Sequence, residues 1–588
     1  MESNTMINDR RWIMGALLVA TAILIFFHNR SWYPPDDGIY AHIAHRLLNG
    51  KVLNGDIQNL HGGVPSFIHA ASLYLFGESL VSFRYALVAL GLVQCVLVFR
   101  LMPGTTRISA FAASTATVAY GFVLFPNPSA NWYALFLATL LTYVMSIRAD
   151  SNGKFVLIGL LIGICFLTRQ LSAVFLAMGA LAGLAILPNR SEWGSDRDPV
   201  TSRSEWLGRA TLIMICVGIL LYFGFVSRDS AAFLLFGLFP ALVAGWTAFN
   251  PSIRPELSFH AMGRMLTGYG LAFIPLVAYH MFNGTVASWI HDVFLLPFTI
   301  PALDFVGERS YVLLLTDAIA GFLSGLSELR VSAIAASGLI LWFMLAPMIL
   351  GFFVMKRVVR NQWAGFRPLH VVALFFAMVS AHYAIPIYLY FSAGLTTAAL
   401  LDVLVRQQFV HFRIAAYSTL LGAGCAVLFL AGRSPATLDR VLAGVAEPKT
   451  YVPREQRLGL WIETDDAHAY GKLVDRIQNL TPPDSPIFVF PAHPEIYFVA
   501  NRPNPTIFAN MALGVRSCLH LGDLIDSLRR KEVGTVVQFE SDKYATRYSE
   551  LLADWLALHY VMDDSIGEAR IFVKRDKFDK LPAISCTD

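Results

Sequence analysis

The stretch at 32–63 reads WYPPDDGIYAHIAHRLLNGKVLNGDIQNLHGG and follows an almost wholly apolar run at 12–27. Arg10 and Arg11 precede that run, as basic residues do on the cytoplasmic side of a membrane span. The chain is therefore expected to cross the membrane here, which places the adjacent acids Asp36 and Asp37 at the opposite membrane surface. Carboxylates in that position are well placed for chemistry at the membrane.

The composition predicts a polytopic membrane protein. Of the 588 residues, 56% are hydrophobic and only 15% are charged, which is more apolar sequence than a soluble core can use. The net charge of +4 is small and the basic residues fall in loops that flank apolar runs, so nucleic acid is not an expected partner. The first span is expected to be retained, because His28 stands where a signal peptide would have a small-residue cleavage site.

Thirteen apolar runs are candidate membrane spans. Two of them, 154–168 and 171–187, are shorter than the ~20 residues of a full span and could instead form one re-entrant pair around Arg169. With a cytoplasmic N-terminus, the loops on the inner side carry most of the arginine and lysine, as the positive-inside rule requires. The runs are 12–27, 82–99, 108–125, 132–147, 154–168, 171–187, 210–226, 230–248, 265–282, 331–355, 369–387, 389–405 and 414–431.

An odd number of spans predicts an extracytoplasmic C-terminus for this multi-pass protein of the cell membrane, the inner or plasma membrane. From 433 onward, helix-like stretches alternate with β-rich ones, which is typical of a small α/β domain. We predict a transmembrane module at 1–431 and a soluble extracytoplasmic α/β domain at 432–588. Cys518 and Cys586 could pair in that domain if it lies outside the cytosol.

The predicted secondary structure of the C-terminal domain is specific enough to be tested. Helices are expected at 466–480, 522–531 and 543–558, and strands at Ile487–Phe490, Thr535–Phe539 and Arg570–Val573. Long external loops are expected at 28–81 and 283–330.

In the first of these loops, Ile39, Ile43 and Leu47 recur at i, i+4 and i+8, which predicts an amphipathic helix lying in the membrane interface. A second helix is expected at Ser66–Phe76, where a proline opens the apolar stretch. The paired acids would then lie on a loop that two helices brace against the membrane.

The residues Asp36-Asp37-Gly38-x-Tyr40, the acid Asp56 and the His61-x-x-x-Pro65 pattern resemble the first external loop of GT-C glycosyltransferases. Within that superfamily the chain resembles the dolichyl-phosphate-mannose-protein mannosyltransferase-related group and the bacterial lipid A aminoarabinose transferases. FLTRQ at 166–170 is similar to the basic L-[TS]-[KR]-[QP] element of these proteins. The expected fold is then a polytopic α-helical membrane protein of about 13 transmembrane helices with a C-terminal extracytoplasmic α/β domain.

The chain also departs from the pattern of these proteins. Asp37 replaces the usual second acid, glutamate, and Gly62-Gly63 replaces the proline-rich pair of the aminoarabinose enzymes. The resemblance therefore implies a reaction type and leaves the substrate open.

The implied reaction is an inverting transfer of a hexose or pentose from a polyprenyl-phosphate donor to a lipid, glycan or protein acceptor. The enzyme has to deprotonate the acceptor hydroxyl, align it and stabilise the departing phosphate. By resemblance Asp36 is the catalytic base, and Asp37 orients it or binds the acceptor. The alternative is that both acids cap the helix that follows them.

Two arginines are candidates for binding the donor phosphate, because a guanidinium makes bidentate charged hydrogen bonds to phosphate oxygens. They are Arg84 and Arg169, each at an end of an apolar run, and either could instead extend its side chain to the membrane interface. Asp56 and His61 are the candidate substrate-binding residues of the first loop, although His61 could be an ordinary loop residue.

A divalent metal is possible but not indicated, because the acids and His61 of the first loop offer hard ligands without a recognised metal-site spacing. No cofactor is expected. In the second loop, charged residues are expected to be ordinary solvated positions: His291, Asp292, Asp304, Glu308 and Arg309.

A transporter or flippase of lipid-linked sugars is the alternative function for the whole chain. It would require ionisable or broken segments in mid-membrane and a two-fold internal repeat, and neither is evident in the sequence.

Overall fold

The computed structural model describes residues 2–147, 152–187, 202–302, 310–363, 365–406, 410–433, 448–540 and 544–575. The chain divides into two compact units. The helical unit comprises Met1–His28, Leu87–Pro275 and Arg309–Ala446, and the mixed unit comprises Asn29–Ala86, Leu276–Glu308 and Glu447–Asp588.

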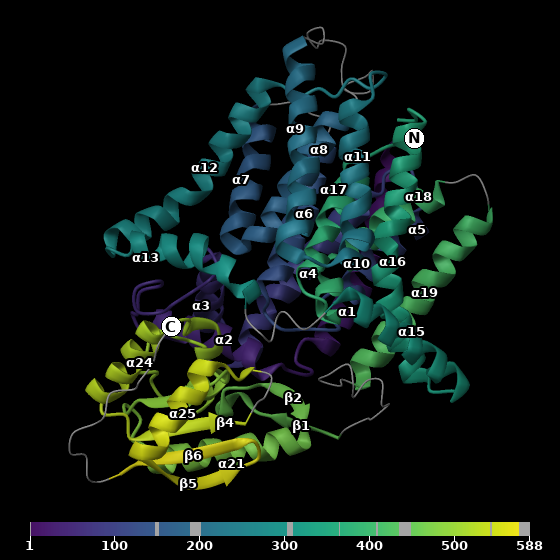
Figure 1. Cartoon of the computed structure of the whole chain (residues 1–588). Coiled ribbons are helices and arrows are strands. Elements are labelled where there is room, and N and C mark those ends of the chain that lie inside the picture. The colour runs from purple at the N-terminus through teal and green to yellow at the C-terminus, as the bar shows by residue number, and fades with distance from the viewer. Residues whose placement is uncertain are drawn as a thin grey trace. The chain divides into compact units, whose positions relative to one another are not determined.

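Helices account for nearly all of the helical unit, and the longest run side by side in Figure 1. Each of the thirteen predicted apolar runs falls on a helix, and seven helices among the described residues are long and apolar enough to cross a membrane. The predicted fold class, a polytopic helical membrane protein with a C-terminal region of helices and strands, is therefore confirmed. The elements are α1 (Glu2–Phe27), α4 (Leu80–Leu101), α5 (Arg107–Tyr120), α6 (Ala130–Ser146), α7 (Asn152–Thr168), α8 (Gln170–Ile186), α9 (Ser202–Leu221), η1 (Tyr222–Ser227), α10 (Ser230–Ala232), η2 (Phe233–Gly237), α11 (Leu238–Phe249), α12 (Phe259–Phe282), α15 (Tyr311–Ser327), α16 (Val331–Val359), α17 (Pro368–Phe376), η5 (Ala377–His382), α18 (Pro386–Val405) and α19 (Val410–Arg433).

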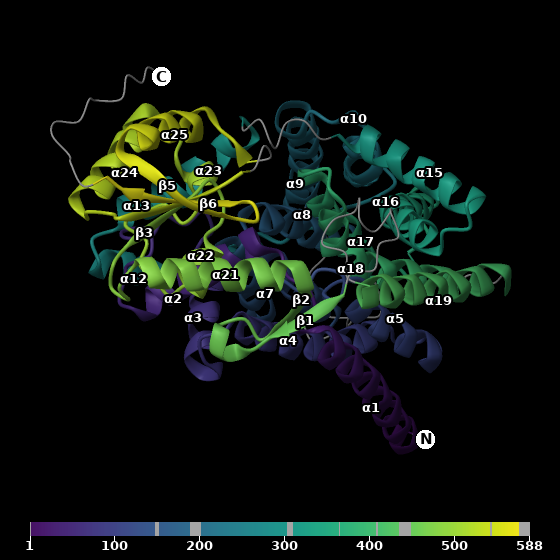
Figure 2. The same cartoon turned by 90° about the horizontal axis from the view of Figure 1, so that it is seen from below.

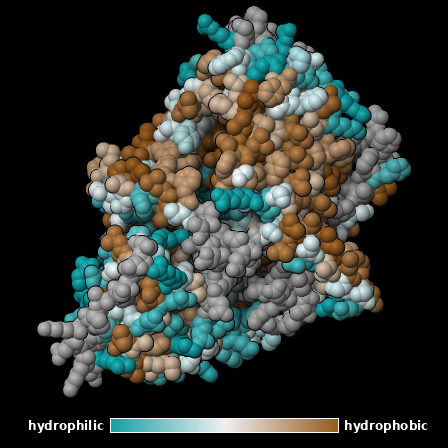
Figure 3. Space-filling model, in the orientation of Figure 1, coloured by the Kyte–Doolittle hydropathy of each residue, from teal (hydrophilic) through white to brown (hydrophobic). Residues whose placement is uncertain are grey.

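The outer surface of this unit is apolar. Figure 3 shows hydrophobic residues over the visible face of α9, α11 and α12, where the exposed side chains include Trp206, Met214, Trp246, Phe249 and Ile274. In water such a continuous apolar surface would be unfavourable, whereas lipid tails cover it without cost.

Helices α7 and α8 are separated only by Arg169, whose backbone is extended. Each has 17 residues, so each is about 25 Å long, slightly less than the ~30 Å hydrocarbon core. Glycines bring α7 close to α12: a Cβ on Gly159 would lie 1.8 Å from the carbonyl oxygen of Met265, and one on Gly268 would lie 1.9 Å from that of Val156. Such close backbone approach is typical of helix packing in membranes.

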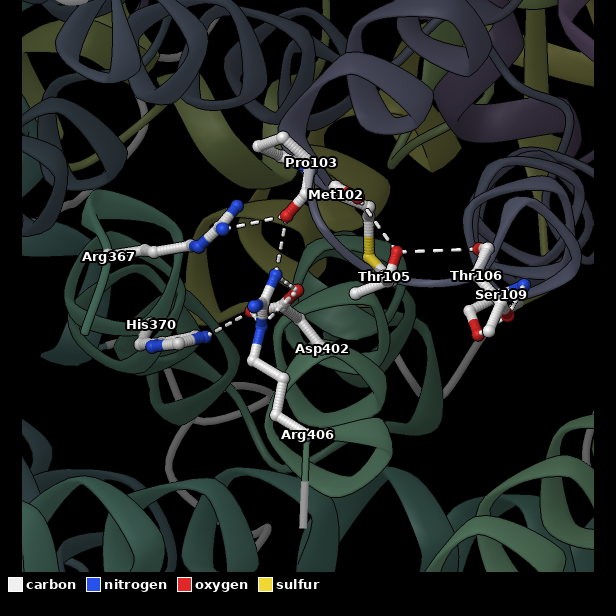
Figure 4. Close-up of polar contacts among 9 residues, drawn as sticks. All are labelled: Met102, Pro103, Thr105, Thr106, Ser109, Arg367, His370, Asp402 and Arg406. Atoms are coloured by element: carbon white, nitrogen blue, oxygen red, sulfur yellow. Dashed lines mark hydrogen bonds and ion pairs between the residues drawn. The ribbon is translucent and has the colours of Figure 1, made fainter. Parts of the chain in front are cut away.

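A buried polar network joins α17 and α18 to the turn between α4 and α5 (Figure 4). His370 Nε2 lies 2.8 Å from Asp402 Oδ2, and the guanidinium of Arg406 donates to the same carboxylate at 3.0 Å. Arg406 and Arg367 also donate to the carbonyl oxygen of Pro103, at 2.6 and 2.7 Å. Four helix ends that carry basic residues therefore meet at one end of this unit, as the positive-inside pattern predicts.

The mixed unit contains a four-stranded sheet in the order β3-β4-β6-β5. β3 and β4 are parallel, with Val489 opposite Val537, while β6 is antiparallel to both of its neighbours. The elements are α2 (Pro34–Leu48), α3 (Val64–Phe76), α13 (Val286–Ile290), η3 (His291–Leu295), η4 (Leu296–Ala302), β1 (Lys449–Val452), η6 (Arg454–Gln456), β2 (Leu460–Glu463), α21 (Thr464–Leu480), β3 (Ile487–Phe490), α22 (Glu495–Val499), α23 (Met511–Gly514), α24 (Cys518–Arg530), β4 (Thr535–Phe539), α25 (Arg547–His559), β5 (Tyr560–Ile566) and β6 (Ala569–Lys574).

Helices cover both faces of this sheet, as Figure 2 shows. Side chains alternate along β3, so that Phe488 and Phe490 pack with α24 and α25, while Ile487 and Val489 pack with α21 and α22. The three helices and three strands predicted for this region are all present.

The first loop shares a hydrophobic core with the C-terminal residues of the mixed unit. Ala41 and Ala44 of α2 pack in one cluster with Leu460, Ile462 and Phe498. The apolar spacing of α2 therefore serves packing inside this unit, where the helix buries most of its middle turns. The mixed unit contains both residues 29–86 and residues 447–588, which the predicted boundary at 431/432 assigns to different domains.

Candidate active site

The paired acids lie in the first turn of α2, and not in a loop before it as expected. Prolines occupy the first two helical positions after Tyr33, because their fixed φ suits a helix start, and the acids follow directly. Negative charge in a first turn is favoured by the helix dipole. The carboxylate of Asp37 also accepts a hydrogen bond from the backbone N–H of Tyr33, at 2.9 Å. Asp37 therefore bonds the backbone of the N-cap residue, in part as the alternative role of helix capping predicted.

Asp37 forms a buried ion pair with Arg84 of α4. The distance from Arg84 Nη2 to Asp37 Oδ2 is 3.4 Å, and the exposed fractions of the two residues are 0% and 1%. Arg84 also donates to the carbonyl oxygen of Arg30. Burial raises the pKa of Asp37 above its ordinary value, against the charge of Arg84 and the Tyr33 N–H, which lower it.

A second buried carboxylate, Glu495 of α22, approaches the same turn. A Cβ on Gly38 would lie only 2.3 Å from the backbone nitrogen of Glu495, so this contact requires glycine. Glu495 is fully buried, and its Oε1 accepts from the Tyr470 hydroxyl at 2.8 Å and lies 2.7 Å from His493 Nδ1. Its negative charge also raises the pKa of Asp37. A second buried carboxyl group therefore lies close to the Asp37–Arg84 ion pair.

Asp36 differs from its neighbour in being half-buried. It is adjacent to a carboxylate that a guanidinium and a backbone N–H hold in place. A carboxylate that remains accessible beside a fixed partner is able to accept a proton from a bound hydroxyl group.

Asp56 and His61 both shape the loop after α2. The Asp56 carboxylate accepts from the backbone N–H of Val52 at 2.8 Å, and its carbonyl oxygen accepts from Arg46 at 3.0 Å. His61 is half-buried, and its carbonyl oxygen accepts from the Asn59 side chain. These contacts give both residues a structural role, and substrate binding by either of them stays a prediction.

Arg169 belongs to the helical unit, where it forms the N-cap position of α8. Its side chain is only 7% exposed, and its guanidinium lies 5.2 Å from the ring centroid of Tyr388. Its Nη1 has no hydrogen-bond partner among the described residues. A buried guanidinium nitrogen without a partner is costly, which an anionic ligand would relieve.

The structure thus brings Asp36, Asp37 and Arg84 together at the start of α2 and holds Asp56 and His61 in the following loop of the same unit. Sequence reasoning missed Glu495, His493 and Tyr470 as neighbours of the acids. The segment FPAHPEIYF at 490–498 carried a signal, because its glutamate and histidine stand among apolar residues.

The remaining predictions concern the cysteines, the second loop and a metal ion. Cys518 is disulfide-bonded, whereas Cys586 lies outside the described residues. Asp304, Glu308 and Arg309 of the second loop also lie outside them. Within the described ranges, no group of three His, Cys, Asp or Glu side chains could hold a metal ion.

Comparison with known proteins finds solved structures that are similar along nearly the whole chain. One is the crystal structure of ArnT from Cupriavidus metallidurans bound to undecaprenyl phosphate, which is 12% identical, with a TM-score of 0.37 and coverage of 96% of this chain and 97% of ArnT. Another is ArnT in the apo state, which is 12% identical, with a TM-score of 0.40 and coverage of 97% and 98%. ArnT is a lipid A aminoarabinose transferase of the GT-C class, one of the groups that the first loop resembles. At this identity and these TM-scores, the similarity carries no argument about the activity of this chain. No family model and no curated protein matches it.

Proposed function

We propose that this protein is an integral membrane glycosyltransferase that moves a sugar from a polyprenyl phosphate to an acceptor hydroxyl, with inversion at the anomeric carbon. The observation that carries the proposal is the start of α2, where a half-buried Asp36 stands beside an Asp37 that Arg84 and the Tyr33 N–H hold. The first-loop motif, which resembles that of GT-C enzymes, supports the same assignment.

The chemistry requires one proton transfer and one displacement. The acceptor oxygen forms a bond to the anomeric carbon while the bond from that carbon to the phosphate oxygen breaks, and the polyprenyl phosphate leaves with the electron pair. Asp36 takes the hydroxyl proton as the new bond forms, because the hydroxyl group becomes acidic only then. A monophosphate leaving group depends less on a divalent metal ion than a nucleotide diphosphate does.

Asp37 and Arg84 are positioning residues in this proposal. Because their ion pair is buried, a phosphate could reach Arg84 only by displacing Asp37 and leaving that carboxylate uncompensated. Donor-phosphate binding by Arg84 is therefore less well supported than by Arg169. The Asp37–Arg84 pair instead fixes the first turn of α2 and with it the direction of Asp36.

Arg169 is the proposed phosphate-binding residue. Its buried, incompletely bonded guanidinium is suited to an oxyanion, and the charge on the leaving oxygen grows as the bond to the sugar breaks. Arg169→Ala is expected to weaken binding of the lipid-phosphate sugar and to slow transfer. Arg169→Lys should restore both only in part, because an ammonium lacks the planar fork.

The matched control for Arg169 is Arg228, whose side chain donates only to a carbonyl oxygen of its own turn among the described residues. Arg228→Ala should leave donor affinity unchanged. Equal donor affinity in Arg169→Ala and the wild type would remove Arg169 from the phosphate site.

We further propose that the acids act on the extracytoplasmic face, with the N-terminus in the cytoplasm. Basic helix ends gather at one end of the helical unit, and a disulfide at Cys518 is typical of an oxidising compartment. A topology reporter fused after Asp588 should be active only outside the cytoplasm, and cytoplasmic activity would contradict this orientation.

The decisive experiment supplies the purified protein with radiolabelled polyprenyl-phosphate sugars and an extract of envelope lipids and glycans, and follows transfer of label. Asp36→Asn is expected to slow transfer by about 10²- to 10⁴-fold, since the amide keeps the shape but cannot accept the proton. Asp37→Asn should cost less. Asp484→Asn, at an exposed loop position of the same unit, is the control and should transfer at the wild-type rate. Wild-type turnover by Asp36→Asn would refute the base assignment.

A further inference from the structure

The mixed unit contains a cavity of about 370 Å³ beside the loop that follows α2. Three segments of the chain line it: residues 54–58 of the first loop, residues 287–292 of α13 and η3, and residues 507–520 before and within α24. Its volume lies in the range of ordinary small-molecule sites. None of the residues proposed above for catalysis or phosphate binding lines this cavity.

Hydrogen bonds hold the wall of this cavity in a fixed shape. Asn54 is 3% exposed and has a left-handed backbone, with a φ of 55°. Its side-chain nitrogen donates to Asp292 Oδ2 at 2.9 Å and to the Asn59 carbonyl oxygen at 2.8 Å. His291 Nδ1 lies 3.1 Å from the other Asp292 oxygen. Asp292, expected from sequence to be solvated, is in fact buried and joins the second loop to the first.

One polar atom of this wall is unsatisfied. Asn54 Oδ1 is buried and has no hydrogen-bond partner among the described residues. An amide oxygen in that state loses free energy of about 1–3 kcal/mol unless a ligand or water donates to it. Asn54, a lining residue of the cavity, therefore carries one buried acceptor without a partner among the described residues.

The side chains that line the cavity indicate which class of ligand it could bind. It combines two amides, a hydroxyl group, a carboxylate and two imidazoles with one aromatic ring, from Asn54, Gln58, Ser288, Asp292, His520 and Phe508 among others. No lysine or arginine is among the described residues that line the cavity, whereas the Asp292 carboxylate is, and its negative charge disfavours a phosphate or carboxylate ligand. Amides and a carboxylate match vicinal hydroxyl groups, and an aromatic ring matches the apolar face of a sugar.

We propose that this cavity binds a neutral or amine-bearing sugar residue of the acceptor, which makes the acceptor a glycan. The inference rests on the proposed function and names the substrate class of the same enzyme. Leu53 and Ile57 pack with Ile43, about two helical turns beyond Asp36, so the bound sugar is distinct from the one that carries the reacting hydroxyl. Binding energy from such a remote unit aligns the reacting hydroxyl and raises kcat/KM.

The test is direct sugar binding to the full-length protein in detergent, without donor, measured by saturation-transfer NMR. The probes are glucose, galactose, mannose, N-acetylglucosamine and glucosamine, with glucuronate and glucose 6-phosphate as anionic counterparts. At least one neutral or amino sugar should bind saturably, and the anionic sugars at least 10-fold more weakly.

Ala287→Trp fills the cavity from an exposed rim position and leaves the Asn54–Asp292 bond intact. It should weaken sugar binding at least 10-fold, whereas Ala557→Trp, at an exposed position of α25, should not change it. The proposal is overturned if none of the sugars binds, if Ala287→Trp binds as the wild type does, or if the anionic sugars bind equally well.

Sugar binding and sugar transfer are measured in separate experiments, so each can refute the proposed glycan site or the proposed transferase activity without the other. Asp36→Asn should bind the sugar normally. Sugar binding that depends on Ala287 in a protein without transferase activity would refute the proposed function alone, and transfer that is insensitive to Ala287→Trp would refute the glycan site alone.

Discussion

Replacing Arg84 by methionine, which keeps the unbranched apolar stem and removes the charged group, is expected to destabilise the mixed unit by about 3–5 kcal/mol at neutral pH. Coulomb's law with an effective dielectric constant of 20 gives about 5 kcal/mol for the lost attraction at 3.4 Å. Protonating an isolated carboxyl group with a pKa of 3.8 at pH 7 costs about 4 kcal/mol, which bounds the penalty in a second way. Both agree with the cost of leaving one buried charge uncompensated.

The stability lost in Arg84→Met is expected to increase with pH. Without Arg84 the pKa of Asp37 rises further, because burial then acts without the opposing charge. Below pH 3.8 the carboxyl group is protonated in both the folded and the unfolded chain. Above it, the unfolded chain ionises first, so the deficit of Arg84→Met grows as the pH rises toward the raised pKa. The deficit should be smallest near pH 4 and largest near pH 8.

Hydrogen exchange of peptides covering α2 measures this opening free energy in the full-length protein. A loss of 3–5 kcal/mol corresponds to about 10²- to 10⁴-fold faster exchange at pH 7. Asp37→Leu in the Arg84→Met background should restore most of the protection, since no buried charge remains. Arg570→Met breaks an exposed ion pair with Glu540 in the same unit and should cost under about 1 kcal/mol. Equal exchange in Arg84→Met and the wild type, or a loss independent of pH, would refute this account.

Three other variants test separate contacts. Gly38→Ala forces a Cβ against the backbone of Glu495 and should destabilise the mixed unit by about 1–3 kcal/mol, whereas Gly471→Ala, in open space on α21, should be neutral or stabilising; thermal unfolding compares them. Asp402→Asn leaves its buried histidine partner and its half-buried arginine partner without a counter-charge, so the unfolding midpoint of the helical unit should fall. An unchanged midpoint would show that the network of Figure 4 adds no stability. Burial lowers the pKa of His45 to about 4, so folding favours the neutral imidazole. This contribution to stability is complete above pH 6.5 and is lost as the pH falls from 6.5 to about 4. His45→Gln should therefore make the free energy of unfolding less dependent on pH between these two values.

The sequence predicted those parts of the fold that depend on local pattern. Each apolar run became a helix, and the β-branched and aromatic residues of β3 and the amphipathic pattern of α24 were sufficient to locate both elements. These signals are local, because the order of apolar and polar residues within one short segment is enough to indicate its secondary structure. The predicted helix began at Ile39, whereas α2 begins five residues earlier at Pro34, because prolines at the first helical positions are equally compatible with a loop.

The candidate site was predicted only in part, because its partners are distant in sequence. Asp36 and Asp37 were identified from their motif, but nothing near them indicates that Arg84 pairs with Asp37. An arginine at the end of an apolar run has the same local pattern whether it binds phosphate or a buried carboxylate. Asp292 looked solvated for a similar reason, since its partner Asn54 lies in the other loop.

The close contact between Gly38 and Glu495 sets an order of events in biosynthesis. Glu495 is translated 457 residues after Gly38, an interval of about 20–90 s at 5–20 residues per second. During this time Ala41, Leu73 and Phe83 lack the partners that Leu460 and Phe498 later provide. The first loop is therefore made as an incomplete core that must be kept from aggregation until the chain is nearly finished. A chain that terminates before α22 would leave this surface permanently exposed and would be a substrate for quality control even with all of its membrane helices in place.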